Sequence, residues 1–304
     1  MEYNGILPLL KPKGMTSHDC VFRLRKLLKT KKIGHTGTLD PDVTGVLPIC
    51  IGKATKVAEY MTDYPKEYIG EVTLGWTTTT EDRSGEILEQ KPVEIIPTLD
   101  QINEVLNTFI GEIEQVPPMY SAVKVNGKKL YEYAREGKEV ERPVRRIKIY
   151  ELQLVGNEIK SYDNAVSFSF RVKCSKGTYV RTLAVDIGKK LGYPAHMSYL
   201  ERIASGPFKL SDCYTFEQIE TLISNNEVQN SLLSLEKAIE HFPSVLVNSS
   251  IEAKIRNGSV LPLLKSIAEK RFTVYNEDGE CLAIYQQHPT KEGLMKPEKM
   301  LCSS

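Results

Sequence analysis

Long apolar runs are missing from this sequence of 304 residues, and this absence argues against a helical membrane protein. No stretch approaches the roughly 18 uninterrupted apolar residues that a membrane-spanning helix needs. The opening stretch, residues 1–15, also lacks the basic region, apolar core and cleavage site of a secretory signal peptide. The six cysteines stand far apart, with no CxxC pair, so we expect reduced thiols rather than disulfides or a zinc site. Together these absences predict a cytoplasmic protein.

The familiar cofactor motifs are missing as well. No Gly-rich phosphate loop follows a predicted strand, which leaves nucleotide hydrolysis and dinucleotide binding without support. The five histidines, at 18, 35, 196, 241 and 288, lie at no metal-ligand spacing from one another or from a cysteine. The nucleophile elbow of serine hydrolases is absent too. If the chain is an enzyme, the sequence favours carboxylate chemistry without a cofactor or a metal.

Positive charge is present but unevenly distributed, behind a net charge of only +1. The segment 23–32, "RLRKLLKTKK", holds six basic residues in ten. The segment 123–149 holds nine basic residues and four acidic ones. One such run usually indicates a solvated helix face. Two runs in an otherwise balanced chain favour a polyanionic partner, with nucleic acid first.

Apolar periodicity predicts a mixed sheet flanked by helices. Two helices begin with a Thr-x-x-Gln capping box, at Thr98 and Thr215, and Gly111 is the expected stop of the first of them. The segment 166–174 alternates strictly, which is typical of a half-buried strand. We expect helices in the ranges 16–30, 98–111, 180–191 and 215–223, and strands in the ranges 45–52, 67–75 and 166–174. Because alternating and continuous strands coexist, the sheet should not be purely parallel.

The pattern of predicted secondary structure changes near residue 245. Short strand candidates, "RFTVYN" and "CLAIYQ", follow there and are joined by the turn "EDGE". We expect a mixed α/β domain over residues 1–244 and a small β-rich module over residues 245–304.

Candidate chemistry lies in "GHTGTLDPDVTG", residues 34–45. Because Asp40 precedes Pro41, its backbone is pushed out of the helical region, and its side chain projects from irregular structure. An Asx-turn or a helix cap is the ordinary role of such an aspartate. Asp42 can fill that role, however, and leave Asp40 free. The local sequence does not decide between turn former and reagent.

The larger pattern resembles the TruB family of bacterial tRNA pseudouridine synthases. "GHTGTLDPDVTGVLPICIGKATK" is similar to the family's catalytic motif, and "LLKPKGMTSHD" to its N-terminal signature. "KEYIGEVTLGWTTTTEDRSGEI", "PPMYSAVKVNGKKLYEYAREG", "CSKGTYVRTLAVDIG" and "YLERIASGPF" match later family motifs, in family order, over about residues 5–210. The resemblance implies an α+β pseudouridine synthase fold with a largely antiparallel sheet. It also implies that the C-terminal module is a PUA-like RNA-binding domain.

Catalytic roles follow from this resemblance by position. Asp40 takes the place of the aspartate that reacts covalently with the target uridine, without any cofactor. Arg181 occupies the position that pairs with it, and a guanidinium keeps a sheltered carboxylate ionised. Its ordinary alternative is an exposed arginine at a helix start. Tyr68 matches the tyrosine that stacks on the base and assists proton removal at C5.

Substrate-binding roles follow in the same way. Tyr179 and Leu200 match residues that line the uracil pocket, although each is also compatible with an ordinary core position. His35 matches the histidine that fills the stack next to the extruded base. Lys56 is expected to bind a phosphate.

The expected substrate is the T-arm loop of tRNA, where uridine 55 becomes pseudouridine, and the expected protein is a monomer with no membrane or nucleotide partner. The insert 123–149 is expected to grip the RNA, as a mobile flap whose short helix lies between Gly127 and Gly137. An RNA-binding folding chaperone without chemistry is the alternative, but binding alone needs no combination of Asp40, Tyr68 and Arg181. A glycosidase using Asp40 and Asp42 is disfavoured, because carboxylates two residues apart do not flank one bond.

Overall fold

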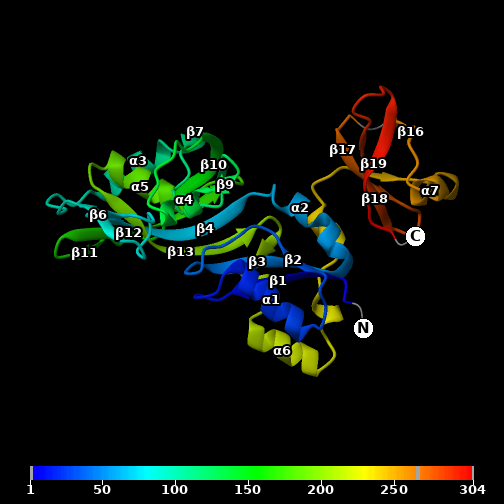
Figure 1. Cartoon of the computed structure of the whole chain (residues 1–304), viewed down its shortest axis with the longest axis horizontal. Coiled ribbons are helices and arrows are strands. Elements are labelled where there is room, and N and C mark those ends of the chain that lie inside the picture. Colours follow the sequence, from blue (N-terminus) through cyan, green and yellow to red (C-terminus); the bar gives the residue numbers. More distant parts are fainter. Residues whose placement is uncertain (1–2, 265–267, 303–304) are drawn as a thin grey trace.

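A long mixed sheet forms most of the molecule in the computed structural model, which describes residues 3–264 and 268–302 (Figure 1). Its main strand order is β1-β3-β13-β4-β12-β10-β7, with β2 paired to β3, β11 to β12 and β14 to β13. Only the β3–β13 pair is parallel among these described pairs, so the expectation of a mixed, largely antiparallel sheet is confirmed. The strands are β1 (Gly5–Lys11), β2 (Ile33–His35), β3 (Thr44–Ile51), β4 (Lys66–Leu74), β7 (Gly111–Gln115), β10 (Arg145–Leu154), β11 (Lys160–Tyr162), β12 (Ala165–Cys174), β13 (Ala195–Ser205) and β14 (Phe208–Lys209).

Helices flank this sheet where the apolar periodicity placed them. They are α1 (Ser17–Leu27), α3 (Leu99–Asn107), α5 (Val180–Lys190) and α6 (Phe216–Ser224), with the short helices α2 (Ala58–Met61), α4 (Leu130–Arg135), η1 (Gly52–Val57), η2 (Leu210–Asp212), η3 (Gln229–Ser231) and η4 (Leu235–Ala238). The capping boxes predicted at Thr98 and Thr215 are both present. Gly111 does not stop α3, which ends at Asn107. Its φ of +113° instead suits the turn into β7.

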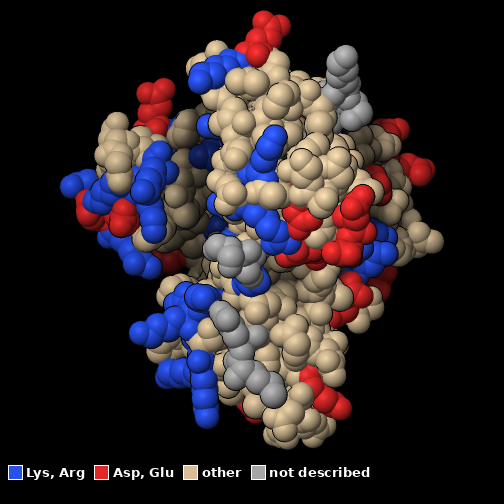
Figure 2. Space-filling view, turned by 90° about the vertical axis from the view of Figure 1, so that its right-hand side faces the viewer, with Lys and Arg blue, Asp and Glu red and all other residues tan. Residues whose placement is uncertain are grey.

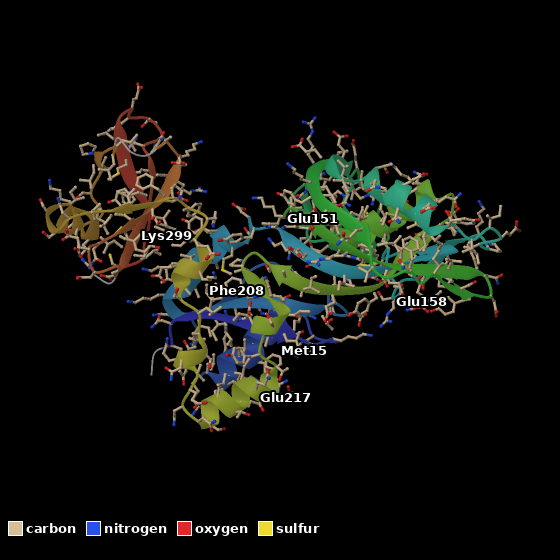
Figure 3. The ribbon with its side chains drawn as sticks, turned by 180° about the vertical axis from the view of Figure 1, so that it is seen from behind. Met15, Glu151, Glu158, Phe208, Glu217 and Lys299 are labelled. Atoms are coloured by element: carbon tan, nitrogen blue, oxygen red, sulfur yellow. The ribbon has the colours of Figure 1, made fainter. Side chains whose placement is uncertain are left out.

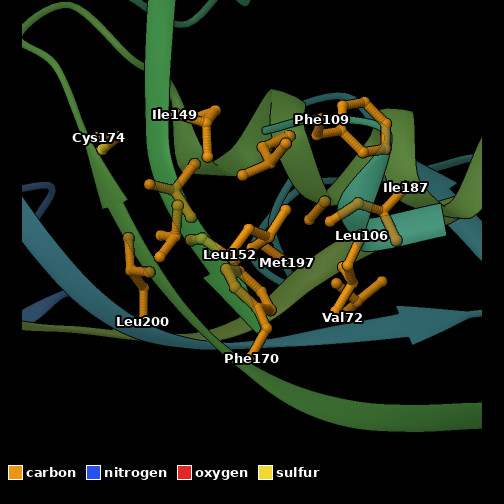
Figure 4. Packing of buried hydrophobic residues seen from close by; sticks show 14 of the residues in the cluster. Val72, Leu106, Phe109, Ile149, Leu152, Phe170, Cys174, Ile187, Met197 and Leu200 are labelled. Atoms are coloured by element: carbon orange, nitrogen blue, oxygen red, sulfur yellow. The ribbon is translucent and has the colours of Figure 1, made fainter. Parts of the chain in front are cut away.

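Two apolar cores hold the helices against the sheet. Alternate residues of β12, including Phe168 and Phe170, pack with Leu106 of α3 and Ile187 of α5 (Figure 4). A second core lies where α1 and α6 cover β1 and β3, with Leu24 fully buried. Each such side chain stabilises the fold by roughly 1.5–3 kcal/mol relative to an exposed position. The first core also includes Val72 of β4 and Met197 of β13, so the middle strands of the sheet are held against α5 as well.

Two hairpins extend from the main sheet. One consists of β5 (Trp76–Thr78) and β6 (Ile87–Gln90), and the other of β8 (Lys124–Val125) and β9 (Lys128–Lys129). The second hairpin runs directly into α4, and together they form the core of the basic insert 123–149.

The C-terminal residues build a separate sheet of five strands. It comprises β15 (Ser244–Leu246), β16 (Leu261–Pro262), β17 (Arg271–Tyr275), β18 (Cys281–Gln287) and β19 (Leu294–Met300), in the order β15-β17-β18-β19-β16, together with α7 (Ser249–Arg256). Its β19 faces the first part of the chain, because Lys299 pairs with Glu59 at 2.7 Å and Tyr60 donates to Glu298 at 3.2 Å. In the rear view of Figure 3, Lys299 lies on the side of this module that faces the rest of the molecule. Within the described part of the chain, no helix has the length and apolar character required to cross a membrane.

Candidate active site

A cavity of about 850 Å³ opens where the loop between β2 and β3 meets β4, β13 and the start of α5. Five of the seven residues expected in the site line it: Asp40, Tyr68, Tyr179, Arg181 and Leu200. Residues 120–122, directly before the insert, also line the cavity, as do Tyr131 of α4 and the first residues of β10. No group of His, Cys, Asp or Glu side chains in the described ranges is arranged to hold a metal ion.

Side chains from distant elements hold the backbone of the loop that carries Asp40. The ammonium of Lys11, on β1, donates to the carbonyls of Pro41 at 3.0 Å and Val43 at 2.7 Å. The hydroxyl of Ser17, at the start of α1, accepts from the amide of Leu39 at 2.9 Å. Lys11 and Ser17 are both buried, so these bonds are shielded from competing water. Distant elements therefore fix the position of Asp40 together with a local turn, in which Val43 N donates to Asp40 O at 3.1 Å.

Gly45 shows how closely this loop approaches the sheet. It pairs with Arg202 where β3 and β13 run parallel, at a φ of +115°. A Cβ atom at this position would lie 2.2 Å from the Arg202 carbonyl oxygen, so only glycine fits without displacing the strand. Arg202 is 1% exposed, and its guanidinium donates to Val46 O at 2.7 Å and Gly37 O at 3.1 Å. Arg202 thus fixes both ends of the loop.

The carboxylate of Asp40 pairs with Arg181 in the wall of the cavity. Arg181 Nε lies 3.1 Å from Asp40 Oδ2, and the arginine side chain is 8% exposed whereas the aspartate is 44% exposed. Arg181 also donates to the carbonyls of Thr80 and Tyr120, both at 3.0 Å, and its Nη1 lies 3.8 Å from Asp82 Oδ2. Arg181 is therefore a buried arginine fixed in several directions, not an exposed residue at a helix start. It holds one carboxylate oxygen of Asp40 and leaves the group open to the cavity.

Tyr68 and Leu200 shape the cavity from neighbouring strands. Tyr68, on β4, is half-buried and is the register partner of Arg202 on β13. Burial raises the pKa of the Tyr68 phenol, although the charge of Arg202 opposes this effect. Leu200 pairs with Gly70, where an added Cβ would lie 3.2 Å from Leu200 Cδ1 and 2.6 Å from the Phe170 ring. The cavity therefore offers a neutral aromatic ring and an apolar side chain.

Tyr179 is held by its backbone. The amide side chain of Gln115, on β7, accepts from Tyr179 N at 2.8 Å and donates to Tyr179 O at 3.0 Å. Gln115 is itself 3% exposed, and both bonds are partly buried. Because Tyr179 is the residue directly before α5, this clamp also sets the start of the helix that presents Arg181.

Sequence reasoning missed Lys66, which lies on β4 two residues before Tyr68 and also lines the cavity. It is 6% exposed, and its ammonium donates to Thr62 O at 2.6 Å and Tyr64 O at 2.7 Å. Burial, with a smaller effect of Arg202, lowers the pKa of Lys66 to about 8. The sequence did offer one signal for Lys66. Residues i and i+2 of a strand point to the same face, so Lys66 should lie on the same face as Tyr68. Asp82 and Arg202 were also missed, although both lie inside motifs that the sequence displays.

His35 and Lys56 are not among the residues that line the cavity. His35 lies on β2, and its pKa is lowered by burial and by the charges of Arg202 and His18. The His35 Nδ1 atom is buried and has no hydrogen-bond partner within the described ranges. Lys56, in η1, is exposed and donates to the Met300 carbonyl of β19 at 2.9 Å. It thus lies where the C-terminal module meets the rest of the chain.

The insert carries most of its positive charge on its surface. Gly127 and Gly137, both with positive φ, bracket the segment that contains α4, as expected. Lys128 pairs with Glu136, and Arg146 pairs with Glu114 at 3.6 Å. Four further basic residues of the insert are exposed and form no ion pair in the described part of the chain: Lys124, Arg135, Arg145 and Lys148. Internal pairs therefore leave much of this charge available.

Family models match most of the chain. Residues 25–180 match the "TruB family pseudouridylate synthase (N terminal domain)". Residues 181–241 match the "tRNA pseudouridylate synthase B C-terminal domain", which places that match before the C-terminal sheet.

Full-length relatives and solved structures agree with this match. A "tRNA pseudouridine synthase B" of Halalkalibacterium halodurans is 60% identical over 100% of this chain and 99% of its own. One from Bacillus licheniformis is 56% identical over 98% of each chain. Among solved structures, a chain of an H/ACA RNP bound to a substrate RNA containing 2′-deoxyuridine is 27% identical, with a TM-score of 0.74 over 98% of this chain and 85% of that one. A chain of a Cbf5-Nop10-Gar1 complex is 30% identical, with a TM-score of 0.73 over the same shares.

Proposed function

This chain belongs to the TruB family of pseudouridylate synthases, and from that premise we propose that it converts uridine 55 in the T-arm loop of tRNA to pseudouridine. In this isomerisation the N1–C1′ bond of the nucleotide breaks, the base turns, and C5 bonds to C1′. The hydrogen on C5 leaves as a proton, and N1 takes one up, so no atom is gained or lost overall. The observation that carries the proposal is the ion pair of Asp40 and Arg181 in the wall of the cavity.

Asp40 supplies the reacting carboxylate in this mechanism. Arg181 binds Oδ2, which keeps the group ionised and oriented while Oδ1 faces the nucleotide. The other bonds of the guanidinium, to Thr80 and Tyr120, prevent it from turning away as charge on Asp40 is consumed. Tyr68 stacks on the uracil and assists removal of the C5 proton.

The target nucleotide must leave the RNA stack to reach Asp40. Extrusion costs a few kcal/mol, which stacking and pocket contacts offset. Tyr179 and Leu200 line the pocket for the base, and His35 fills the space that the base vacates. The unpartnered Nδ1 of His35 supports a role in contacting RNA.

We assign the catalytic domain to residues 1–244 and a PUA-like RNA-binding domain to residues 245–304. The insert 123–149 grips the T-arm by shape and phosphate contact, and Lys56 binds a phosphate near the contact between the domains. The enzyme acts as a cytoplasmic monomer. The exposed charge of the insert supports the first of these roles.

Incubation with an unmodified tRNA transcript, followed by mapping of pseudouridine at nucleotide resolution, tests the proposal. We expect modification at position 55 with the wild-type chain and none with Asp40→Asn. Tight tRNA binding without any pseudouridine would establish a binding protein instead. Modification at another position alone would refute the assignment to the T-arm.

A further inference from the structure

The proposed site does not use the first basic segment of the sequence. Residues 20–39 hold six Lys and Arg residues and no Asp or Glu. Residues 43–58 add Lys53 and Lys56, again without an acidic residue. Two stretches of one charge sign, with only Asp40 and Asp42 between them, therefore surround the catalytic loop in the sequence.

The fold places these stretches side by side. The strand β2 pairs with β3 so that Ile33 lies opposite Ile51, and Gly52 N donates to Lys32 O at 2.8 Å. We define the α1–β2 ridge as five exposed lysines on the end of α1, the turn after it and the start of η1: Lys26, Lys29, Lys31, Lys32 and Lys53. Like charges gathered in this way repel one another unless a polyanion neutralises them.

Internal ion pairs do not account for three of the five ridge lysines. The neighbouring arginines are engaged, since Arg23 pairs with Glu220 at 3.0 Å and Arg25 donates to Ile33 O at 2.8 Å. In contrast, Lys26, Lys29 and Lys31 form no ion pair with any residue that the structure describes, and Lys26 only lies over the exposed Phe22 ring, 4.4 Å from its centroid. The ridge thus differs from a surface laced with salt bridges, which would need no external anion.

The ridge is continuous with the active site. Lys32 directly precedes β2 and lies three positions, or about 10 Å of strand, before His35, and the Asp40 loop follows directly. In the sheet, β2 lies on the β3 side of the central pair β13–β4, whereas the insert joins β7 and β10 on the other side. The cavity therefore lies between two basic surfaces. Figure 2 shows Lys and Arg side chains along one margin of the molecule, in its lower as well as its upper half, with many of the acidic ones toward the other side.

We propose that the α1–β2 ridge binds the sugar-phosphate backbone of the same tRNA, outside the loop that holds the target uridine. This inference rests on the proposed tRNA substrate. Ammonium groups on a convex surface bind phosphates without reading bases, so the ridge positions the RNA and adds affinity that does not depend on sequence. Contacts on both sides of the cavity would hold the arm while one nucleotide is extruded between them.

The test is a triple variant, K26Q/K29Q/K31Q, compared with K91Q/K189Q/K190Q. The control removes the same charge from exposed lysines near the end of α5 and β6. Affinity for a full-length unmodified transcript is measured at several salt concentrations, after thermal unfolding has shown that both variants fold. Three lost phosphate contacts should reduce the slope of log affinity against log salt by about 2 to 3, at roughly 0.7 to 0.9 each. The control should keep the wild-type slope, and both variants should keep the wild-type rate at saturating enzyme.

An unchanged slope in the folded ridge variant overturns the proposal, and so does an equal loss in the control. K31E gives an independent reading, because charge reversal at one ridge position should weaken binding more at low salt than at high salt. Failure of the proposed function gives a different result. In that case the wild-type chain binds the transcript but forms no pseudouridine, while the salt slopes still decide whether the ridge contacts RNA.

Discussion

Replacement of Arg181 by lysine should nearly abolish turnover while the positive charge is kept. The guanidinium makes three short contacts, to Asp40 at 3.1 Å and to two backbone carbonyls at 3.0 Å, from a site that is almost fully buried. An ammonium is a point charge on a flexible stem and cannot make these contacts in the same plane. Loss of one preorganised donor beside a reacting charge costs about 2.7–4 kcal/mol, which is a rate loss of roughly 10²–10³.

Stability should change less than activity. A carbonyl left without a donor costs about 1–3 kcal/mol, and lysine can still satisfy one of the two. The Asp40 side chain is 44% exposed, so its ion pair contributes more to orientation than to folding. We therefore expect Arg181→Lys to remain folded at 25 °C, with an unfolding free energy reduced by about 1–3 kcal/mol.

The assay is release of tritium from C5 of uridine in tRNA, under single-turnover conditions with enzyme in excess. Conversion displaces the hydrogen from C5, so release reports the chemical sequence rather than binding. Arg83→Lys is the matched control, because Arg83 is exposed in the same segment as Asp82 and should tolerate the change. A folded Arg181→Lys variant that reacts within about three-fold of wild type would refute the role of the planar clamp.

Asp40→Asn should abolish pseudouridine formation but reduce tRNA affinity little, because affinity rests on many phosphate contacts. Tritium release measures the turnover and binding isotherms measure the affinity. Turnover near the wild-type rate would contradict the assignment of Asp40 as the reacting carboxylate. Glutamine at Lys124, Arg135 and Arg145 together should flatten the salt dependence of binding by roughly 0.7 to 0.9 per lost contact and leave the fold intact; an unchanged slope would show that the insert does not touch the RNA backbone. Lys66→Met tests the buried ammonium. The folded pKa of Lys66, about 8, lies below its ordinary value of 10.5, so the unfolded chain binds more protons between these limits and wild-type stability rises with pH there. The free energy of unfolding of the wild type should increase relative to Lys66→Met by up to about 3 kcal/mol from pH 8 to 10.5. Chemical denaturation across this range measures the difference, and a constant difference would mean that Lys66 is solvated.

Local signals were sufficient where the structure depends on neighbours in the sequence. The capping boxes at Thr98 and Thr215 and the alternation along β12 act over a few residues, and each predicted its element correctly. The end of α3 was misplaced because a glycine with positive φ serves a helix stop and a strand entry equally well. In the structure, Gly111 begins strand β7 and does not end helix α3.

The site needed more than local signals. The local residues did not decide whether Asp40 forms a turn or takes part in the reaction. The family resemblance indicated Arg181 as its partner. Lysine is almost never fully buried, so Lys11 and Lys66 looked like surface residues. Their burial follows from pairing of strands that are distant in the sequence, which no window of residues reveals. Arg202 illustrates the same limit, because its bond to Gly37 spans 165 residues.

That long span has a consequence for synthesis of the chain. The loop that carries Asp40 emerges from the ribosome early, but the guanidinium that holds Gly37 is made 165 residues later. At 5–20 residues per second, this separation corresponds to roughly 8 to 33 s of translation. Throughout that interval the loop lacks both its Arg202 clamp and the parallel strand against which Gly45 packs. The lysines of the α1–β2 ridge are thus synthesised long before Arg202 can hold the Asp40 loop, and the chemistry proposed for Asp40 becomes possible only when β13 enters the sheet.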